Sequence, residues 1–203
     1  LILADDQTQV STGNGEKHQT DRGMTVSGDN RTGVIISGDR TENTLTGDST
    51  VTDGAVGLAI TGDDTINTIS GHTTVDGAIG ALISGENSST TLAGNINITG
   101  GGIGMIIDGN RAIVDNTGIS NISGAGSKGS VIIGDNILLN NEGELNVSDG
   151  ATGGEIHGND ALVINTGEST VSGAGSTGLY IEGDNAQVIN DGSQTISGGA
   201  TGT

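Results

Sequence analysis

Cysteine, proline, phenylalanine and tryptophan are all missing from this 203-residue sequence, and tyrosine occurs once. Without cysteine, the chain has neither a disulfide framework nor a thiolate metal site. Without large aromatic side chains, it lacks the residues that usually dominate a buried core. Its 39 glycines and 24 isoleucines must order it in another way, and isoleucine favours β-strands.

Basic residues are also scarce, because six lysines and arginines stand against 25 aspartates and glutamates and leave a net charge of −19. Nucleic acids and anionic membrane surfaces are bound through a basic footprint, so neither is an expected partner. No apolar run approaches the ~20 residues of a membrane-spanning helix. This segment is therefore not expected to be embedded in a membrane.

The sequence repeats about every 24 residues, and each unit is numbered here from a glycine at position zero. Isoleucine stands at position +3 of all seven units, glycine at +5 and +14, and valine or isoleucine at +18. All variation in length falls after position +18. The seven starting glycines are Gly33, Gly57, Gly80, Gly104, Gly129, Gly153 and Gly178.

This pattern predicts an all-β fold, a right-handed parallel β-helix (β-solenoid) with three short strands per coil and about eight coils. Glycines at +5 and +14 are expected to supply the backbone freedom of corners. A helix is disfavoured by two fixed glycines per unit, and the nine-residue calcium-binding roll has a different period. Residues 1–32 are interpreted as an N-terminal tail and degenerate capping coil, and 33–203 as β-helix repeats from a longer protein.

Alternation in the first strand of each unit places +1 and +3 inside and +2 and +4 outside. In the second strand, positions +10 and +12 keep one polar and one apolar residue. If +12 faces inward, a ladder of stacked amides hydrogen-bonds from coil to coil, formed by Asn116, Asn141, Asn165 and Asn190.

Two outward columns are the candidate binding surfaces. Position +2 carries an apolar stripe, which marks either a partner contact or simply good strand formers; its members are Ile35, Ala59, Leu82, Ile106 and Val131. Position +17 carries small polar residues, which either stabilise the coils by stacked hydrogen bonds or pair with another molecule; these are Thr50, Thr74, Asn97, Asn121, Asn146, Thr170 and Thr195.

Position +6 is mostly Asp or Asn, as in Gly183-Asp184-Asn185. A hard cation such as Ca²⁺ would relieve repulsion between stacked carboxylates, but glycine-led turns favour Asp and Asn without a metal. His18, His72 and His157 occupy unrelated positions in the repeat. No metal site, cofactor or catalytic residue is predicted, so we do not expect an enzyme.

Units of the form Gly-x-x-Ile-x-Gly-Asp-Asn, followed by Val188 to Gly192 and Thr195 to Gly198, resemble the passenger region of Gram-negative type V autotransporters, in particular AIDA-like and self-associating adhesins. The resemblance covers about residues 24–203. It implies export, display on the bacterial outer surface, and adhesion, autoaggregation or biofilm formation. It also implies self-association through polar ladders along one face, for which position +17 is the nearest match.

The expected partners are therefore the protein itself, in homotypic contacts between cells, or a host or matrix protein or glycan. A polysaccharide-binding or polysaccharide-active β-helix is the alternative function. Ice binding is a third class, because paired Thr and Ser columns suit it, but Asp76 interrupts them.

Overall fold

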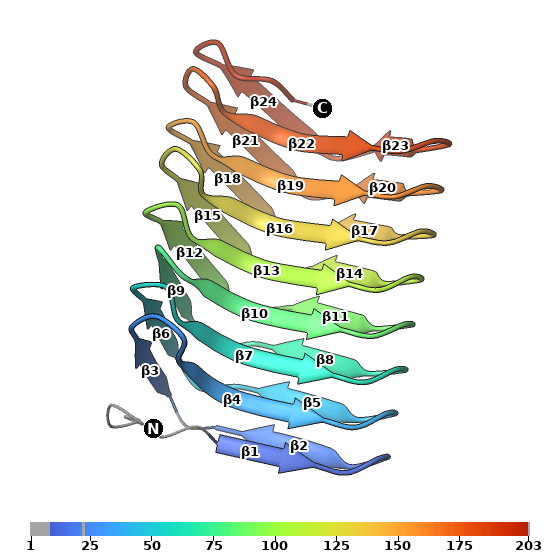
Figure 1. Cartoon of the computed structure of the whole chain (residues 1–203). Helices are drawn as coiled ribbons and strands as arrows, with labels where there is room; N and C mark the ends of the chain where they lie inside the picture. Colours follow the sequence, from blue (N-terminus) through green and yellow to red (C-terminus); the bar gives the residue numbers. More distant parts are fainter. Residues whose placement is uncertain (1–8, 22, 203) are drawn as a thin grey trace.

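The structure is a computed structural model, and it describes residues 9–21 and 23–202. Figure 1 shows a right-handed solenoid in which each coil runs along the front, returns along the back and climbs to the next coil. Three parallel eight-stranded sheets make up its sides. The predicted fold class, with three strands per coil and about eight coils, is confirmed.

Each sheet takes one strand from every coil. The first sheet contains β1 (Gln9–Thr12), β4 (Thr32–Ser37), β7 (Val56–Thr61), β10 (Ile79–Ser84), β13 (Ile103–Asp108), β16 (Lys128–Ile133), β19 (Thr152–His157) and β22 (Thr177–Glu182). The second contains β2 (Lys17–Thr20), β5 (Glu42–Leu45), β8 (Ile66–Ile69), β11 (Ser89–Leu92), β14 (Ile113–Asn116), β17 (Leu138–Asn141), β20 (Leu162–Asn165) and β23 (Gln187–Asn190). The third contains β3 (Met24–Ser27), β6 (Ser49–Thr52), β9 (Thr73–Asp76), β12 (Asn95–Thr99), β15 (Ile119–Ser123), β18 (Glu144–Ser148), β21 (Glu168–Ser172) and β24 (Ser193–Ser197).

The N-terminal strands belong to the same solenoid. β1, β2 and β3 pair in parallel with β4, β5 and β6, so residues 9–21 and 23–27 form the first coil. Residues 1–8 of the N-terminal segment named above lie outside the described residues, as do residues 22 and 203.

Equivalent positions of successive coils lie directly opposite one another. Ile60, for example, pairs with Ile36 on one side and Ile83 on the other. Parallel pairing sets a rise of about 4.8 Å per coil. Side chains of one position therefore stack into columns, and the isoleucines at +3 form a ladder through the interior that is buried from Ile36 to Ile156.

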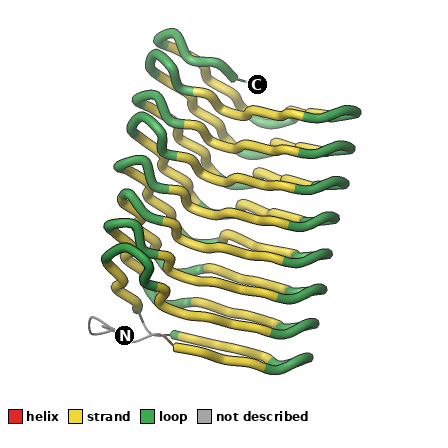
Figure 2. The backbone as a smooth tube through the Cα atoms, in the orientation of Figure 1, coloured by secondary structure: helices red, strands yellow, loops and turns green. Residues whose placement is uncertain are grey.

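The corners recur at the same places in every coil (Figure 2). After the first sheet, position +5 is a glycine with positive φ in six of seven units, 142–157°. Position +7 is left-handed without being glycine, for example Asp64 at 57° and Asn136 at 60°. Asn and Asp tolerate this region better than most residues, which suits the Gly-Asp-Asn corners.

The glycine at +14 has a different role from the predicted one. A Cβ on Gly71 would lie 2.1 Å from the carbonyl oxygen of Gly47, and one on Gly94 would lie 2.1 Å from that of Gly71. Neither glycine has a positive φ. Close approach of stacked backbones, rather than conformational freedom, requires glycine at this corner.

The interior contains two polar ladders. In the N-terminal coils, position +10 is polar and buried, and Asn43 Nδ2 donates to Asn67 Oδ1 at 2.8 Å. From Asn116 onward the polar residue is at +12, where the amides of Asn116, Asn141, Asn165 and Asn190 are linked in order at 2.7 Å per step. The conditional prediction of an inward amide ladder at +12 is confirmed.

Candidate binding surfaces

The candidate residues at +17 lie in register on the outer face of the third sheet. Successive members are paired across the strands, and Thr25 of β3 pairs with Thr50 and adds an eighth. All eight are exposed or half-buried. We call this set the polar column: Thr25, Thr50, Thr74, Asn97, Asn121, Asn146, Thr170 and Thr195.

Three amides at the centre of the polar column are connected by hydrogen bonds. Asn146 Nδ2 donates to Asn121 Oδ1, and Asn121 Nδ2 donates to Asn97 Oδ1, both at 2.9 Å. The ring of His72 lies at one end, with Nε2 3.1 Å from Asn97 Nδ2. Asn146 Nδ2 also donates to Glu144 Oε1 at 2.7 Å, so both of its N–H donors are used. A carboxamide has two N–H donors and two acceptor lone pairs, so Asn121, with one link on each side, retains further hydrogen-bonding capacity.

The polar column is uncharged, although the chain carries a net charge of −19. The neighbouring column at +19 contains a single charged residue, Asp76, among Thr52, Thr99 and four serines from β15 to β24. Asp76 Oδ1 accepts a hydrogen bond from Thr99 Oγ1 at 3.1 Å. On this side the face presents hydroxyls and amides, whereas the +15 column on the other side of the polar column carries Asp48, Glu144 and Glu168.

The candidate residues at +2 lie in register on the outer face of the first sheet, as predicted. Ile35, Leu82, Ile106 and Val131 are half-buried, and the column ends at Glu155 and Tyr180. Val10, 61% exposed, occupies the same column at the N-terminal end.

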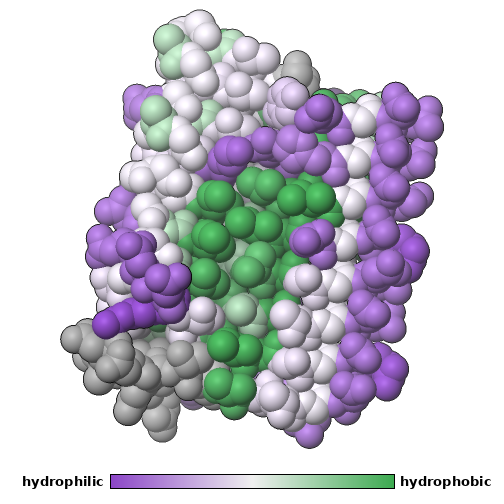
Figure 3. Space-filling view, in the orientation of Figure 1, coloured by the Kyte–Doolittle hydropathy of each residue, from purple (hydrophilic) through white to green (hydrophobic). Residues whose placement is uncertain are grey.

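The apolar surface is wider than this single column. In the first-sheet strands, positions zero and +1 both face inward, so position −1 faces outward. Strict alternation through the glycine places position −1 inside, and sequence reasoning therefore missed it. We call the combined surface the apolar patch: Ile35, Val56, Ala59, Ile79, Leu82, Ile103, Ile106, Val131 and Ile133. Figure 3 shows it as a continuous hydrophobic area over β4 to β16.

The two candidate surfaces are not brought together, because the polar column lies on the third sheet and the apolar patch on the first. Each runs along the solenoid axis. They are therefore two separate faces that would engage partners independently.

The acidic corners at +6 have a structural role in the stack. Side-chain oxygens there accept the backbone N–H of the next coil: Asp39 Oδ1 from Asp63, Asp63 Oδ1 from Glu86, and Asp135 Oδ1 from Asn159, at 2.7–3.1 Å. Asn110 makes the same bond to Asp135, which explains why Asp and Asn interchange. Within residues 9–21 and 23–202, no group of three or more His, Asp or Glu is arranged to hold a metal ion.

An ionic cluster closes the C-terminal edge of the apolar patch. Glu155 pairs with Lys128 and lies 2.8 Å from His157 Nε2, while His157 Nδ1 lies 3.1 Å from Glu182. The hydrogen bond from Lys128 lowers the pKa of Glu155 below its ordinary value of 4.5.

Elsewhere, hydrogen bonds from Ser27 and then Thr52 lower the pKa of exposed Asp53.

The three histidines lie apart. His18 is on the second sheet beside Ser11, at 2.8 Å, His72 precedes β9 of the third sheet, and His157 is on the first.

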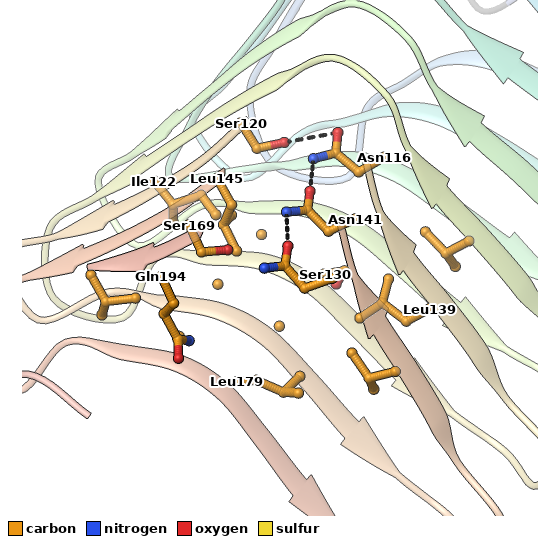
Figure 4. Close-up of a pocket in the computed structure, with 18 of the residues that line it drawn as sticks. Asn116, Ser120, Ile122, Ser130, Leu139, Asn141, Leu145, Ser169, Leu179 and Gln194 are labelled. Carbon is orange, nitrogen blue, oxygen red and sulfur yellow. Dashed lines mark hydrogen bonds between the residues drawn. The ribbon is translucent and has the colours of Figure 1, made fainter. Parts of the chain in front are cut away.

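A partly open pocket of about 120 Å³ extends into the interior of the C-terminal coils, and its lining reaches Val188, Gln194 and Gly202 of the last coil. Position +1 is large at Leu58 and Met105 but becomes Ser130 and then Gly154, so the interior is underfilled there. Figure 4 shows Ser130, Leu139, Leu145 and Leu179 around the space, with the Asn116–Asn141 ladder along one wall.

These features define the chain as a β-solenoid with two distinct outer faces. Comparison with protein-family models, curated proteins and solved structures finds no match. The described part of the chain contains no helix of sufficient length and hydropathy to cross a membrane.

Proposed function

We propose that this chain is an adhesive segment of a bacterial surface protein, which binds copies of itself on neighbouring cells through the polar column. The observation that carries the proposal is the in-register, uncharged column of eight hydrogen-bonding side chains on a highly acidic molecule. The repeat style resembles that of autotransporter passengers, and this resemblance supports export and surface display as part of the proposal. The proposed role is binding, without catalysis or a cofactor.

The chemistry of the polar column suits self-recognition. Hydroxyls and carboxamides both donate and accept, so one column is complementary to a second copy of itself. Each new hydrogen bond contributes only about 1 kcal/mol net, but a column of eight strands repeats the contact over about 34 Å. Many weak contacts of this kind give reversible association between cells that display many copies.

Sedimentation of the purified chain over a range of concentrations tests this proposal. We expect concentration-dependent association, and we expect it to be abolished by Thr50→Asp combined with Thr74→Asp, because each copy would then place two unpaired carboxylates in the interface. The matched control is Thr44→Asp with Thr68→Asp, which adds the same charge on the outer face of the second sheet.

If the control pair abolishes association to the same extent, the effect is due to net charge, and the role of the polar column is refuted. A strict monomer at all concentrations would refute self-association through this segment. Autoaggregation of cells that display the same variants provides the cellular readout.

A further inference from the structure

We infer that the apolar patch is a second binding site, which accepts a cationic amphipathic helix of a partner protein. This site lies on a different sheet from the polar column and does not depend on the proposed self-association.

The first observation is that the patch is uncovered. Nine apolar side chains from β4, β7, β10, β13 and β16 lie side by side on the outer face of a parallel sheet. Parallel sheets are usually covered on both faces, most often by helices. Eight of these side chains remain partly accessible, and Ile133 is 44% exposed. A surface of this kind marks a contact site.

The second observation is the charge beside the patch. Six acidic residues lie at or just after the strand ends along one edge, and among the described residues only Arg40 and Arg111 oppose them there. Arg111 is already paired with Glu86, at 2.6 Å. We call this edge the acidic rim: Asp39, Asp63, Asp64, Glu86, Asp108 and Asp135. A partner that combines an apolar stripe with flanking lysines or arginines satisfies both surfaces.

The dimensions favour a short helix. From β4 to β16 the patch spans four inter-coil steps, or about 19 Å along the solenoid axis. A helix of about 13 residues has this length, and its apolar stripe faces one side. Lying along the axis, such a helix directs one basic flank at the acidic rim, which runs in the same direction (Figure 3).

A second copy of this chain fits less well. The patch measures about 19 by 16 Å, so two copies face to face would bury about 600 Å² in total, well below the roughly 1,200 Å² of a stable interface. Each copy would also bring its own acidic rim to this interface. A short basic segment would bury a similar area, but its charge is opposite to that of the acidic rim, so it is attracted where a second copy is repelled.

The test uses three fluorescein-labelled 14-residue peptides, with binding followed by fluorescence anisotropy at physiological salt. The probe has leucine at helix spacing (i, i+3, i+4, i+7) and lysine elsewhere; one control has glutamate in place of lysine, and the other has the probe's composition in scrambled order. We expect the intact 203-residue chain to bind the probe at least tenfold more tightly than either control.

Substitutions then locate the site. Leu82→Glu with Ile106→Glu is expected to weaken binding of the probe at least tenfold, although the added charge alone would strengthen attraction to a basic peptide. The matched control is Ile66→Glu with Ile113→Glu, which makes the same change at exposed positions of the second sheet, 53% and 37% accessible. This control is expected to bind as the unaltered chain does.

Two further variants keep the test decisive. If the glutamate pair fails to fold, as judged by circular dichroism, Leu82→Thr with Ile106→Thr replaces it, because threonine suits an exposed strand position. Asp63→Asn with Asp135→Asn keeps the oxygens that accept backbone N–H groups and removes two rim charges; it should weaken binding severalfold. Equal binding of the scrambled peptide, or equal loss in the second-sheet control, would overturn the inference.

Discussion

A methyl group added at Gly154 should stabilise the solenoid, whereas one added at the adjacent Gly153 should destabilise it. A Cβ on Gly154 would lie 3.2 Å from Leu179 Cδ1 and 3.5 Å from Ser130 Oγ, at the wall of the pocket in the C-terminal coils. A Cβ on Gly153 would lie 2.4 Å from the carbonyl oxygen of Gly178. The first position requires a small shift of a flexible side-chain end, and the second requires movement of the backbone.

The expected gain for Gly154→Ala has two sources. Gly→Ala at a compatible backbone position stabilises by about 0.4–1 kcal/mol through the unfolded state. Burial of one methyl contributes up to about 0.8 kcal/mol more, reduced by the adjustment of Leu179. A net gain of about 1 kcal/mol should raise the melting temperature by about 2–4 °C in a chain of this size. Gly153→Ala should cost about 1–3 kcal/mol or more, because the site is already filled.

Thermal unfolding followed by far-ultraviolet circular dichroism measures both variants, and urea unfolding provides a second scale. The reference is the equivalent position +1 of other coils, where Ala81 and Met105 carry side chains in the same register. Equal destabilisation by both alanines would refute the pocket and show that the interior is filled beside Gly154.

Two further predictions concern polar contacts. Asn141→Leu should lower the free energy of unfolding by about 2 kcal/mol or more, because it leaves Asn116 Nδ2 and Asn165 Oδ1 without their buried partner. Asn140→Leu, on the outer face of the same strand, should lower it by less than half as much, and urea unfolding measures both variants. Glu155→Gln should reduce stability at neutral pH but not well below pH 4.5. The pKa of Glu155 is lowered in the folded state, so the carboxylate stabilises the fold above its ordinary pKa, and this contribution is lost as the pH falls through the folded-state pKa. Urea unfolding from pH 3 to 7, with exposed Glu142→Gln as the charge control, measures this; a difference that persists at the lowest pH would contradict it.

Most of the fold was predictable because stacking repeats one environment in every coil. Ile36 and its equivalents occupy the same buried column, so the same residue type returns at each coil, and the period is visible without any long-range information. The inward amide ladder was predictable for the same reason, since an unpaired buried amide would be costly and four stacked amides satisfy one another.

Features that depend on the backbone path were not predictable from the period. Alternation failed at the starting glycine, because a residue without a side chain allows two successive inward positions. As a result Val56, Ile79 and Ile103 face outward and widen the apolar stripe into a patch. The steric requirement at Gly71 and the pocket beside Gly154 likewise depend on distances between neighbouring coils, which the sequence pattern does not contain.

The separation of core and surface columns makes the two proposed binding faces experimentally independent. Positions +3 and +18 form the interior, whereas +17 and +2 project outward from different sheets. A substitution at Thr74 therefore changes the polar column and one at Leu82 changes the apolar patch, and neither alters the isoleucine ladder. A variant of one face that retains the unfolding transition and the binding behaviour of the other face isolates a single contact. Because both faces are held in register by the same backbone hydrogen bonds, loss of both activities together would indicate that the stack itself has been disrupted.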